Sequence, residues 1–339
     1  PPHFLWFRFA KLCHKNRSGL GAGEPGVSQI RIVQGKLKIM IKDIPTSEEF
    51  DSAAKAQFDF AWDIVISFLL TLEEAKGYAD VEEDEKAFWE TARQRILTSL
   101  IITQQGVELA IKGKLVTISP YLLISGNHSD WPKDNDGTGV SFSEFRAIDA
   151  QDLVRVHDTV HEKKLDSGFS ILFDRLRKLR NKAMHTVDKE LNVSAQDVVT
   201  ILLDVHEYLY TDENFVSTRR DFLNNSAATH VFFDTDHVEG LVAKEFLIVF
   251  SFLTPVETLR FFKIDRKQRL YLCPECKYES EKYDLIEPRY AVLRPNEPDS
   301  ENLFCFVCDS LHPVERRDCP GEECPGNVIS VEYDVCCTC

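Results

Sequence analysis

The sequence predicts a mainly α-helical protein: an antiparallel helical bundle with a small N-terminal β-hairpin and a C-terminal double zinc ribbon. Two observations lead to this fold class. Apolar residues between Thr46 and Asn225 recur at the three- and four-residue spacings of amphipathic helices. After Asp265 the pattern changes to short segments rich in cysteine, proline and glutamate. Nine of the ten cysteines of the 339-residue chain lie beyond that point, which predicts a separate cysteine-based domain.

The first 45 residues are expected to carry the small β element. Residues 29–41 alternate around a central glycine in the manner of a hairpin. Upstream, Gly21, Gly23 and Gly26 match in form the glycine pattern of dinucleotide-binding loops, which requires a strand before it and a helix after it. Pro25 interrupts the pattern and a β-like segment follows it, so we interpret these glycines as a plain flexible loop.

The helical domain is expected to occupy residues 46–225. Helices are predicted at about 47–75, 84–118, 149–163, 169–185 and 194–212. The second should end at Ser119-Pro120, because proline disfavours the helical conformation of the residue before it. One or two further helices are predicted in a connector over residues 226–265, and the cysteine-rich domain follows over residues 266–339.

The cysteine-rich domain has the spacing of two tetrahedral metal sites. The first four ligands would be Cys273, Cys276, Cys305 and Cys308, and the second four Cys319, Cys324, Cys336 and Cys339. Because four protein thiolates complete a tetrahedral zinc site, we expect two structural zinc ions and no catalytic metal.

Two further residues are possible ligands. Cys337 is left over and could replace Cys336 or Cys339, and His312 could substitute in either site. Disulfides are the alternative to metal for all these cysteines. They require an oxidising compartment, whereas we expect a cytoplasmic protein.

Charge is distributed unevenly. The net charge of −15 argues against a nucleic-acid-binding surface over the whole protein. Residues 169–185 are the exception: one face carries an apolar stripe, and the other carries Arg175, Arg177, Lys178, Arg180 and Lys182 against the single acid Asp174. No apolar stretch is long and uninterrupted enough to cross a bilayer, so no membrane contact is expected.

The same segment contains a group of residues suited to catalysis. Asn181 and His185 are four residues apart and share a helix face, so Asn181 could orient the imidazole. Arg180 and His185 lie roughly 140° apart around the helix and about 7.5 Å apart along it. One copy therefore converges poorly on one phosphate, whereas two copies across a two-fold axis would form a compact cluster, which favours a homodimer.

Arg180-Asn-Lys-Ala-Met-His185 resembles the RNxxxH form of the Rx4-6H motif of the HEPN superfamily of helical proteins, which includes many ribonucleases. The resemblance covers about residues 47–225, including the upstream GVELAIKGKL and ISPYLLI segments. It implies a HEPN-like bundle and a metal-independent endoribonuclease that acts as a homodimer. It also implies Arg180 and His185 as the catalytic pair, Asn181 as their polar companion, and a toxin or antiviral-defence role with a possible antitoxin or regulatory partner.

Metal-free RNA cleavage is compatible with these residue types. The 2′-hydroxyl is the nucleophile, His185 would act as acid or base near neutral pH, and Arg180 would stabilise the phosphorane. The product would carry a 2′,3′-cyclic phosphate, and DNA would be spared. Arg175, Arg177, Lys178 and Lys182 would contact the RNA substrate.

Three alternatives remain from the residues alone. The bundle and ribbons could form a non-catalytic dimeric module that binds a protein or nucleic-acid partner. In that case His185 would be a cation placed favourably at a helix C-terminus. His157 and His161 imitate part of a metalloprotease motif, but such a site would need a third ligand and a positioned base, and Asp158 is shorter than the usual glutamate. Glu108 could support the RNA site, although an ion pair with Lys112 is the simpler expectation.

Overall fold

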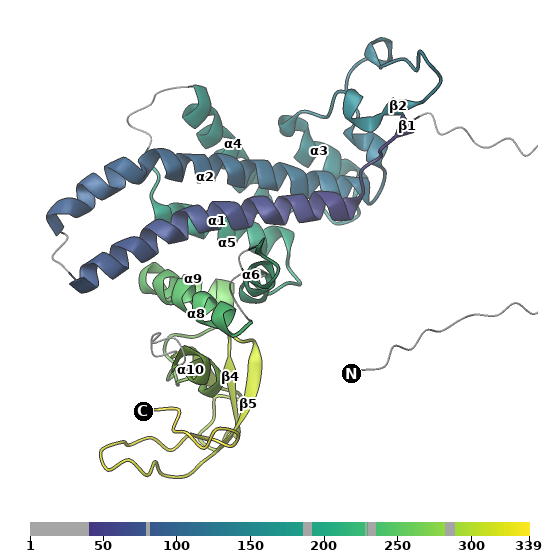
Figure 1. Ribbon diagram of the computed structural model, residues 1–339. Helices are drawn as coiled ribbons and strands as arrows, with labels where there is room; N and C mark the ends of the chain where they lie inside the picture. Colours follow the sequence, from purple (N-terminus) through teal and green to yellow (C-terminus); the bar gives the residue numbers. More distant parts are fainter. Residues whose placement is uncertain (1–40, 79–81, 186–191, 228, 230–234, 282–288) are drawn as a thin grey trace, which may run out of the picture.

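The computed structural model describes residues 41–78, 82–185, 192–227, 229, 235–281 and 289–339 (Figure 1). The predicted glycine loop and nearly all of the predicted hairpin lie outside these residues. The end of the expected β element is β1 (Ile41–Lys42), which pairs in parallel with β2 (Val140–Ser141). This pairing links the start of the helical domain to the end of a polar loop over residues 126–139.

Two long helices, α1 (Ser47–Tyr78) and α2 (Glu82–Val116), form an antiparallel hairpin through the centre of the molecule. Thr46 and Glu49 exchange hydrogen bonds, from the Glu49 N–H to Thr46 Oγ1 (3.2 Å) and from the Thr46 N–H to Glu49 Oε2 (2.8 Å), which caps α1. Gly106 allows the two helices to approach closely, because a Cβ there would lie 2.6 Å from Phe58 Cε1.

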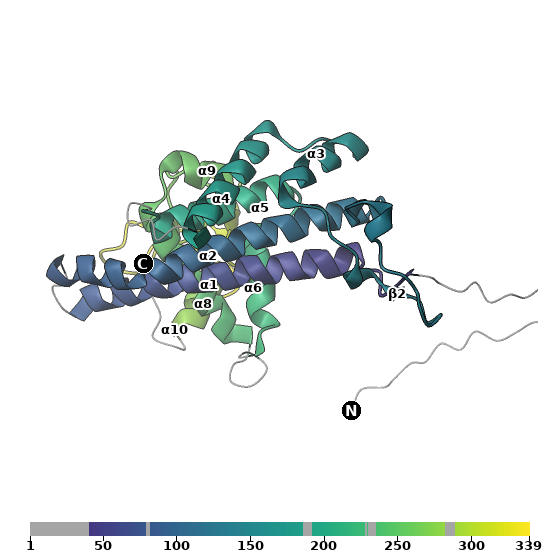
Figure 2. The same cartoon turned by 90° about the horizontal axis from the view of Figure 1, so that it is seen from above.

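The helices α3 (Ala150–Val160), α4 (Ser167–His185) and α5 (Ala195–Leu209) pack against this hairpin. Figure 2 shows α3 and α4 on one side of the hairpin and α6 and α8 on the other. The predicted apolar stripe of α4 is buried at Phe169, Leu172 and Leu176. The structure therefore confirms a mainly helical protein.

Three helices follow α5 in the helical part that the structure describes: α6 (Phe215–Asn224), α8 (Thr235–Phe252) and α9 (Pro255–Phe262). Arg219 of α6 is 2% exposed and binds Glu245 of α8 through two hydrogen bonds of 3.0 and 2.8 Å. It also binds Asp59 of α1 at 3.2 Å and Asp63. This buried ionic cluster joins α6 and α8 to α1, whose Asp59 lies 160 positions before Arg219 in the sequence.

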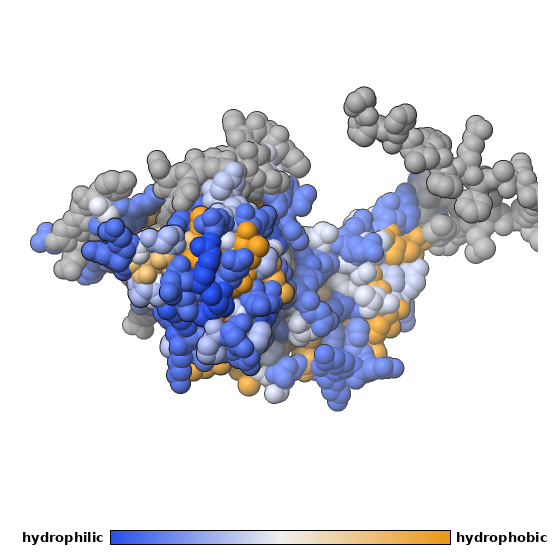
Figure 3. All heavy atoms as spheres, turned by 90° about the horizontal axis from the view of Figure 1, so that it is seen from below, coloured by the Kyte–Doolittle hydropathy of each residue, from blue (hydrophilic) through white to orange (hydrophobic). Residues whose placement is uncertain are grey.

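The cysteine-rich part contains α10 (Pro274–Glu281) and four short strands. They are β3 (Ala291–Leu293), β4 (Asn302–Cys305), β5 (Ser310–Glu315) and β6 (Ile329–Ser330). The strands form an antiparallel sheet in sequence order, with Leu303 opposite His312 across β4 and β5. Figure 3 views the protein from this side and shows a largely hydrophilic surface with small hydrophobic patches.

The hydrophobic core continues from the helical domain into the cysteine-rich part. Phe306 packs against Phe250 of α8, with ring centroids 4.8 Å apart, and Tyr290 Oη donates a hydrogen bond to the Ala243 carbonyl at 2.8 Å. In the described ranges, no helix combines the length and apolar character needed to cross a membrane.

Candidate functional site

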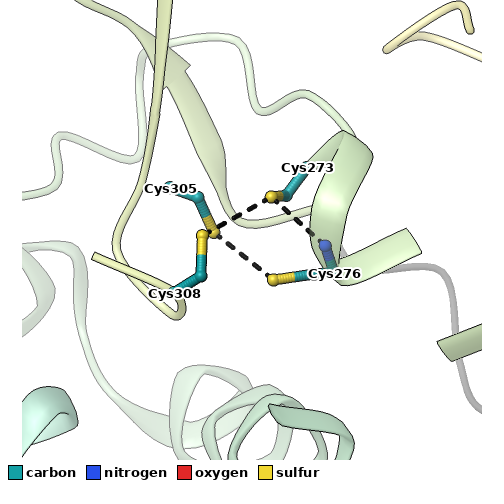
Figure 4. Close-up of side chains that lie close together, drawn as sticks. All are labelled: Cys273, Cys276, Cys305 and Cys308. Carbon is teal, nitrogen blue, oxygen red and sulfur yellow. Dashed lines mark hydrogen bonds between the residues drawn. The ribbon is translucent and has the colours of Figure 1, made fainter. Parts of the chain in front are cut away.

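The first cysteine cluster brings together two segments that are about thirty residues apart in the sequence (Figure 4). Cys273 and Cys276 lie at the start of α10, while Cys305 ends β4 and Cys308 precedes β5. The Sγ–Sγ distance is 3.8 Å both between Cys273 and Cys308 and between Cys276 and Cys305. Sulfurs bound tetrahedrally at about 2.3 Å from zinc lie about 3.8 Å from each other, so the cluster fits a zinc ion.

The second cluster has the same dimensions nearer the surface. Its Sγ–Sγ distances are 3.7 Å between Cys319 and Cys339 and 3.9 Å between Cys324 and Cys336. Backbone N–H groups point at its sulfurs: those of Gly321, Gly326 and Thr338 lie 3.3–3.4 Å from Cys319, Cys324 and Cys336, respectively. The nine cysteines described are all free thiols, and two four-cysteine clusters compatible with two zinc ions account for eight of them.

Metal binding requires thiols that lose their protons, and the pKa is lowered at one or more thiols of each cluster, whereas hydrogen bonds with neighbouring thiols raise the pKa of Cys276 and Cys339. Hydrogen bonds with Cys276 and Cys305 lower the pKa of Cys273 to about 7. Burial alone would raise the pKa of Cys336, but the backbone N–H groups of Cys339 and Thr338 bring it to about 7. Each cluster therefore contains a thiol that ionises near neutral pH.

His312 and Cys337 both lie outside the two sets of four. His312 is 5% exposed, and its Nε2 lies 3.4 Å from Cys273 Sγ and 3.3 Å from Cys308 Sγ, within donor distance of both sulfurs. Cys337 is buried and held by its backbone: its N–H donates to Val328 and its carbonyl accepts from Leu272. Its sulfur belongs to neither cluster, so the sets predicted from spacing are the sets that the fold assembles.

On α4, the structure brings two of the three predicted catalytic residues into contact. Arg180 Nη1 donates a hydrogen bond to Asn181 Oδ1 at 3.0 Å. Asn181 is exposed and Arg180 is half-buried. The backbone of His185 forms the last residue of α4, and its side chain lies outside the described residues.

The basic face predicted from the sequence is only partly continuous. Arg175, Lys178 and Lys182 are exposed and line one shallow hollow together with Ile171. Arg177 faces elsewhere and pairs with Asp174 at 3.6 Å. Three of the four predicted RNA contacts therefore form a strip along α4, and the fourth is partly neutralised.

Helix geometry relates this strip to the end of α4. At about 100° per residue, the Cα of His185 lies roughly 20° around the helix from that of Lys178 and about 40° from that of Asn181. Arg180 lies on the side of Asn181 that faces away from His185 around the helix. Its hydrogen bond to Asn181 holds the guanidinium close to the Asn181 side chain. The backbone of α4 therefore places His185 beside the basic strip, with Asn181 between it and Arg180.

The predicted alternatives occupy different surroundings. His157 is 3% exposed and its ring stacks on that of His161, with centroids 4.2 Å and planes 17° apart. A metal ion lies in the plane of each imidazole that binds it, and planes so nearly parallel do not meet close to the rings. This geometry disfavours a metalloprotease site. Glu108 accepts a hydrogen bond from Gln104 at 2.5 Å.

The buried cluster around Arg219 has no counterpart in the sequence analysis. Burial raises the pKa of Asp59 to about 7, and the negative charges of the nearby Asp63 and Glu245 also raise it. Arg219 lowers this pKa, but by less than burial raises it. Trp62 Nε1 donates to Glu245 Oε2 at 2.8 Å. The only sign of this cluster in the sequence is the four-residue spacing of Asp59 and Asp63, which places both on one helix face. That spacing does not identify a cation on another helix as their partner.

Comparisons with models of protein families, with curated proteins and with solved structures found no match for this chain. The resemblance to the HEPN superfamily therefore rests on the α4 motif and the order of the helices around it.

Proposed function

We propose that this protein is a metal-independent endoribonuclease of the HEPN type that acts as a homodimer. The contact between Arg180 and Asn181 carries the proposal: it lies on the last turns of α4, beside the exposed Arg175–Lys178–Lys182 strip. The strip offers cations to the RNA backbone where His185 ends the helix. Such a local positive surface supports RNA contact by a protein whose net charge is −15.

In the proposed reaction, one His185 takes the proton of the RNA 2′-hydroxyl, and the oxygen attacks the adjacent phosphorus. The bond from phosphorus to the 5′-oxygen breaks, and a proton from the second copy's His185 neutralises that oxygen. The products are a 2′,3′-cyclic phosphate and a 5′-hydroxyl. Arg180 stabilises the negative charge that develops on the phosphorane, and Asn181 holds the guanidinium in place.

Both cysteine clusters are assigned structural zinc in this proposal. Each offers four thiol ligands, so a bound zinc ion would have no open position for water or substrate. The RNA reaction is therefore assigned to α4 alone. A ribonuclease acting on cellular RNA would suit a cytoplasmic toxin or antiviral-defence effector under the control of an antitoxin or regulatory protein.

The test is cleavage of labelled RNA in EDTA, with zinc content measured afterwards so that loss of structural metal is recognised. We expect Arg180→Ala and His185→Ala each to reduce the cleavage rate by about 10²–10⁴-fold. Matched controls are Arg155→Ala on α3 and His128→Ala in the polar loop, both exposed residues, which should stay within about twofold. Equal cleavage by all variants would contradict the proposal.

A non-catalytic dimeric module is the second candidate. It is favoured by Ile171, which is 71% exposed at the N-terminal end of the basic strip and is suited to anchoring a protein partner. A zinc-loaded dimer that cleaves no RNA and causes no toxicity on expression would favour this alternative.

A further inference from the structure

A large open cleft lies at the other end of α4, between the end of α2, the connection from α3 to α4, and the end of α5. Its volume is about 860 Å³, and its polar lining includes Lys114, His157, His161, Lys163, Lys164 and Tyr208. The 19 residues of α4 separate this cleft from His185 by about 27 Å at 1.5 Å per residue. It is therefore distinct from the proposed RNA-cleaving site.

The cleft concentrates positive charge. Lys163 and Lys164 are exposed, and neither forms an ion pair with a described residue. Lys114 is half-buried, and its Nζ donates to the Leu209 carbonyl at 3.1 Å. Burial is the main cause that lowers the pKa of Lys114, and Lys163 acts in the same direction, while the charges of Asp51 and Glu213 oppose the shift.

The acidic groups of the cleft are already engaged. Glu207 and the adjacent Asp204 bind Arg260 at 2.5 and 2.8 Å. Asp166 accepts the N–H of Gly168 at 2.6 Å. The cleft lining thus carries four cations, Lys114, Lys163, Lys164 and Arg260, against the two carboxylates of Asp166 and Glu207.

The histidine pair has fixed hydrogen bonds. His157 Nδ1 donates to Asp158 Oδ1 at 3.0 Å, and His161 Nε2 donates to the Lys114 carbonyl at 2.9 Å, since a carboxylate and a carbonyl can only accept. The Leu165 N–H also binds Asp158 Oδ1, at 2.9 Å. These hydrogen bonds hold the segment that carries Lys163 and Lys164 against α3 and α2. The two lysines therefore extend into the cleft from a backbone whose position is fixed.

We propose that this cleft binds a phosphate-bearing ligand of nucleotide size, with Lys114, Lys163 and Lys164 contacting the phosphate. Ammonium groups bind phosphate as point charges, and three of them around one opening suit a dianionic phosphate monoester better than a single carboxylate. The volume lies in the range of small-molecule sites and leaves room for a base and sugar. Free nucleotides and the 5′-phosphorylated end of RNA share this chemistry.

The test uses adenosine 5′-monophosphate, and a 2′-O-methyl RNA that cannot be cleaved, with either a 5′-phosphate or a 5′-hydroxyl. Binding is measured by calorimetry for the nucleotide and by fluorescence anisotropy for the RNAs. Lys163→Ala/Lys164→Ala should weaken nucleotide binding, or the preference for 5′-phosphate, at least tenfold. The matched control is Lys76→Ala/Lys86→Ala, which removes the same charge from the opposite end of the α1–α2 hairpin.

The outcomes distinguish a free nucleotide from the 5′ end of an RNA as the ligand, and the cleft from the proposed RNA-cleaving site on α4. If the wild type binds the nucleotide and the Lys163/Lys164 variant does not, the ligand is a free nucleotide. If the wild type prefers the 5′-phosphorylated RNA and the variant loses that preference, the ligand is the 5′ end of an RNA. Either effect should persist in Arg180→Ala/His185→Ala, so failure of the ribonuclease proposal leaves this one standing. The inference is overturned if neither nucleotide binding nor a 5′-phosphate preference is detected, or if the Lys163/Lys164 variant matches the control.

Discussion

The ring of Phe306, which lies inside the Cys305–Cys308 knuckle, packs 4.8 Å from the ring of Phe250 on α8. The next residue of the knuckle, Val307, accepts a hydrogen bond from Arg220 of α6 at 3.0 Å through its carbonyl. The loop that supplies two ligands to the first cluster is thus also the loop that contacts the helical domain. Among the described residues, the cysteine loops of the second cluster contain no residue with a ring contact or hydrogen bond to helices α1–α9.

We therefore predict that the two clusters contribute unequally to stability. Cys305→Ser should lower the stability of the whole protein by about 2 kcal/mol more than Cys319→Ser, a difference of about 3 °C in Tm. Calorimetry measures the difference, and hydrogen exchange should show lost protection in α8 only for Cys305→Ser. Equal losses would contradict a docking role for the first cluster.

The position of Cys337 leads to a prediction about metal content. Its backbone is paired with Val328 and Leu272, and its sulfur lies outside both clusters. Cys337→Ala should retain two zinc ions per chain in native mass spectrometry, whereas Cys336→Ala should retain one. The assignment of ligands fails if both variants lose a zinc ion.

The Arg219 cluster should dominate the stability of the helical domain. Arg219→Met leaves Asp59, Asp63 and Glu245 without their cation, and breaking a buried pair in this way costs about 3–5 kcal/mol. Arg155→Met, which breaks the exposed pair with Asp152, should cost at most about 1 kcal/mol. Urea unfolding measures both, and similar losses would show that the buried network is not needed.

The same cluster should make stability depend on pH. The pKa of Asp59 is about 7 in the folded protein and 3.8 in its ordinary state, so the folded protein holds this proton more tightly than the unfolded chain. The stability that comes from the tighter binding of this proton is complete below the unfolded pKa of Asp59, and it is lost as the pH rises through about 7. Because other groups also titrate, the informative quantity is the difference between wild type and Asp59→Asn.

Asp59→Asn should remove this part of the pH dependence. Wild type should lose stability relative to the variant between about pH 4 and pH 7, with a slope of at most about 1.4 kcal/mol per pH unit. Urea unfolding at several pH values measures the slope. Parallel curves for the two proteins would show that Asp59 keeps the same proton affinity when folded.

The sequence predicted the features that depend on local spacing. The helices near residues 47–75 and 169–185 follow from apolar periodicity, and the two cysteine sets follow from the reach of CxxC and CxxxxC loops. The Arg219 cluster and the cleft could not be predicted, because they join charges on helices whose relative placement depends on tertiary packing. His157 illustrates the difference: its spacing from His161 was visible, but its burial and ring stacking depend on α2 and the loop that follows α3.

The chemistry proposed for Arg180 and His185 is tested most directly with an RNA oligonucleotide that is cut at one known position, compared with the same oligonucleotide carrying a single 2′-deoxy nucleotide there. We expect the protein to cut the all-RNA strand in EDTA, leaving a 2′,3′-cyclic phosphate, and to leave the substituted position intact. The Arg180→Ala/His185→Ala protein should cut neither strand. Cleavage at the 2′-deoxy position, or undiminished cleavage by the double variant, would contradict the mechanism.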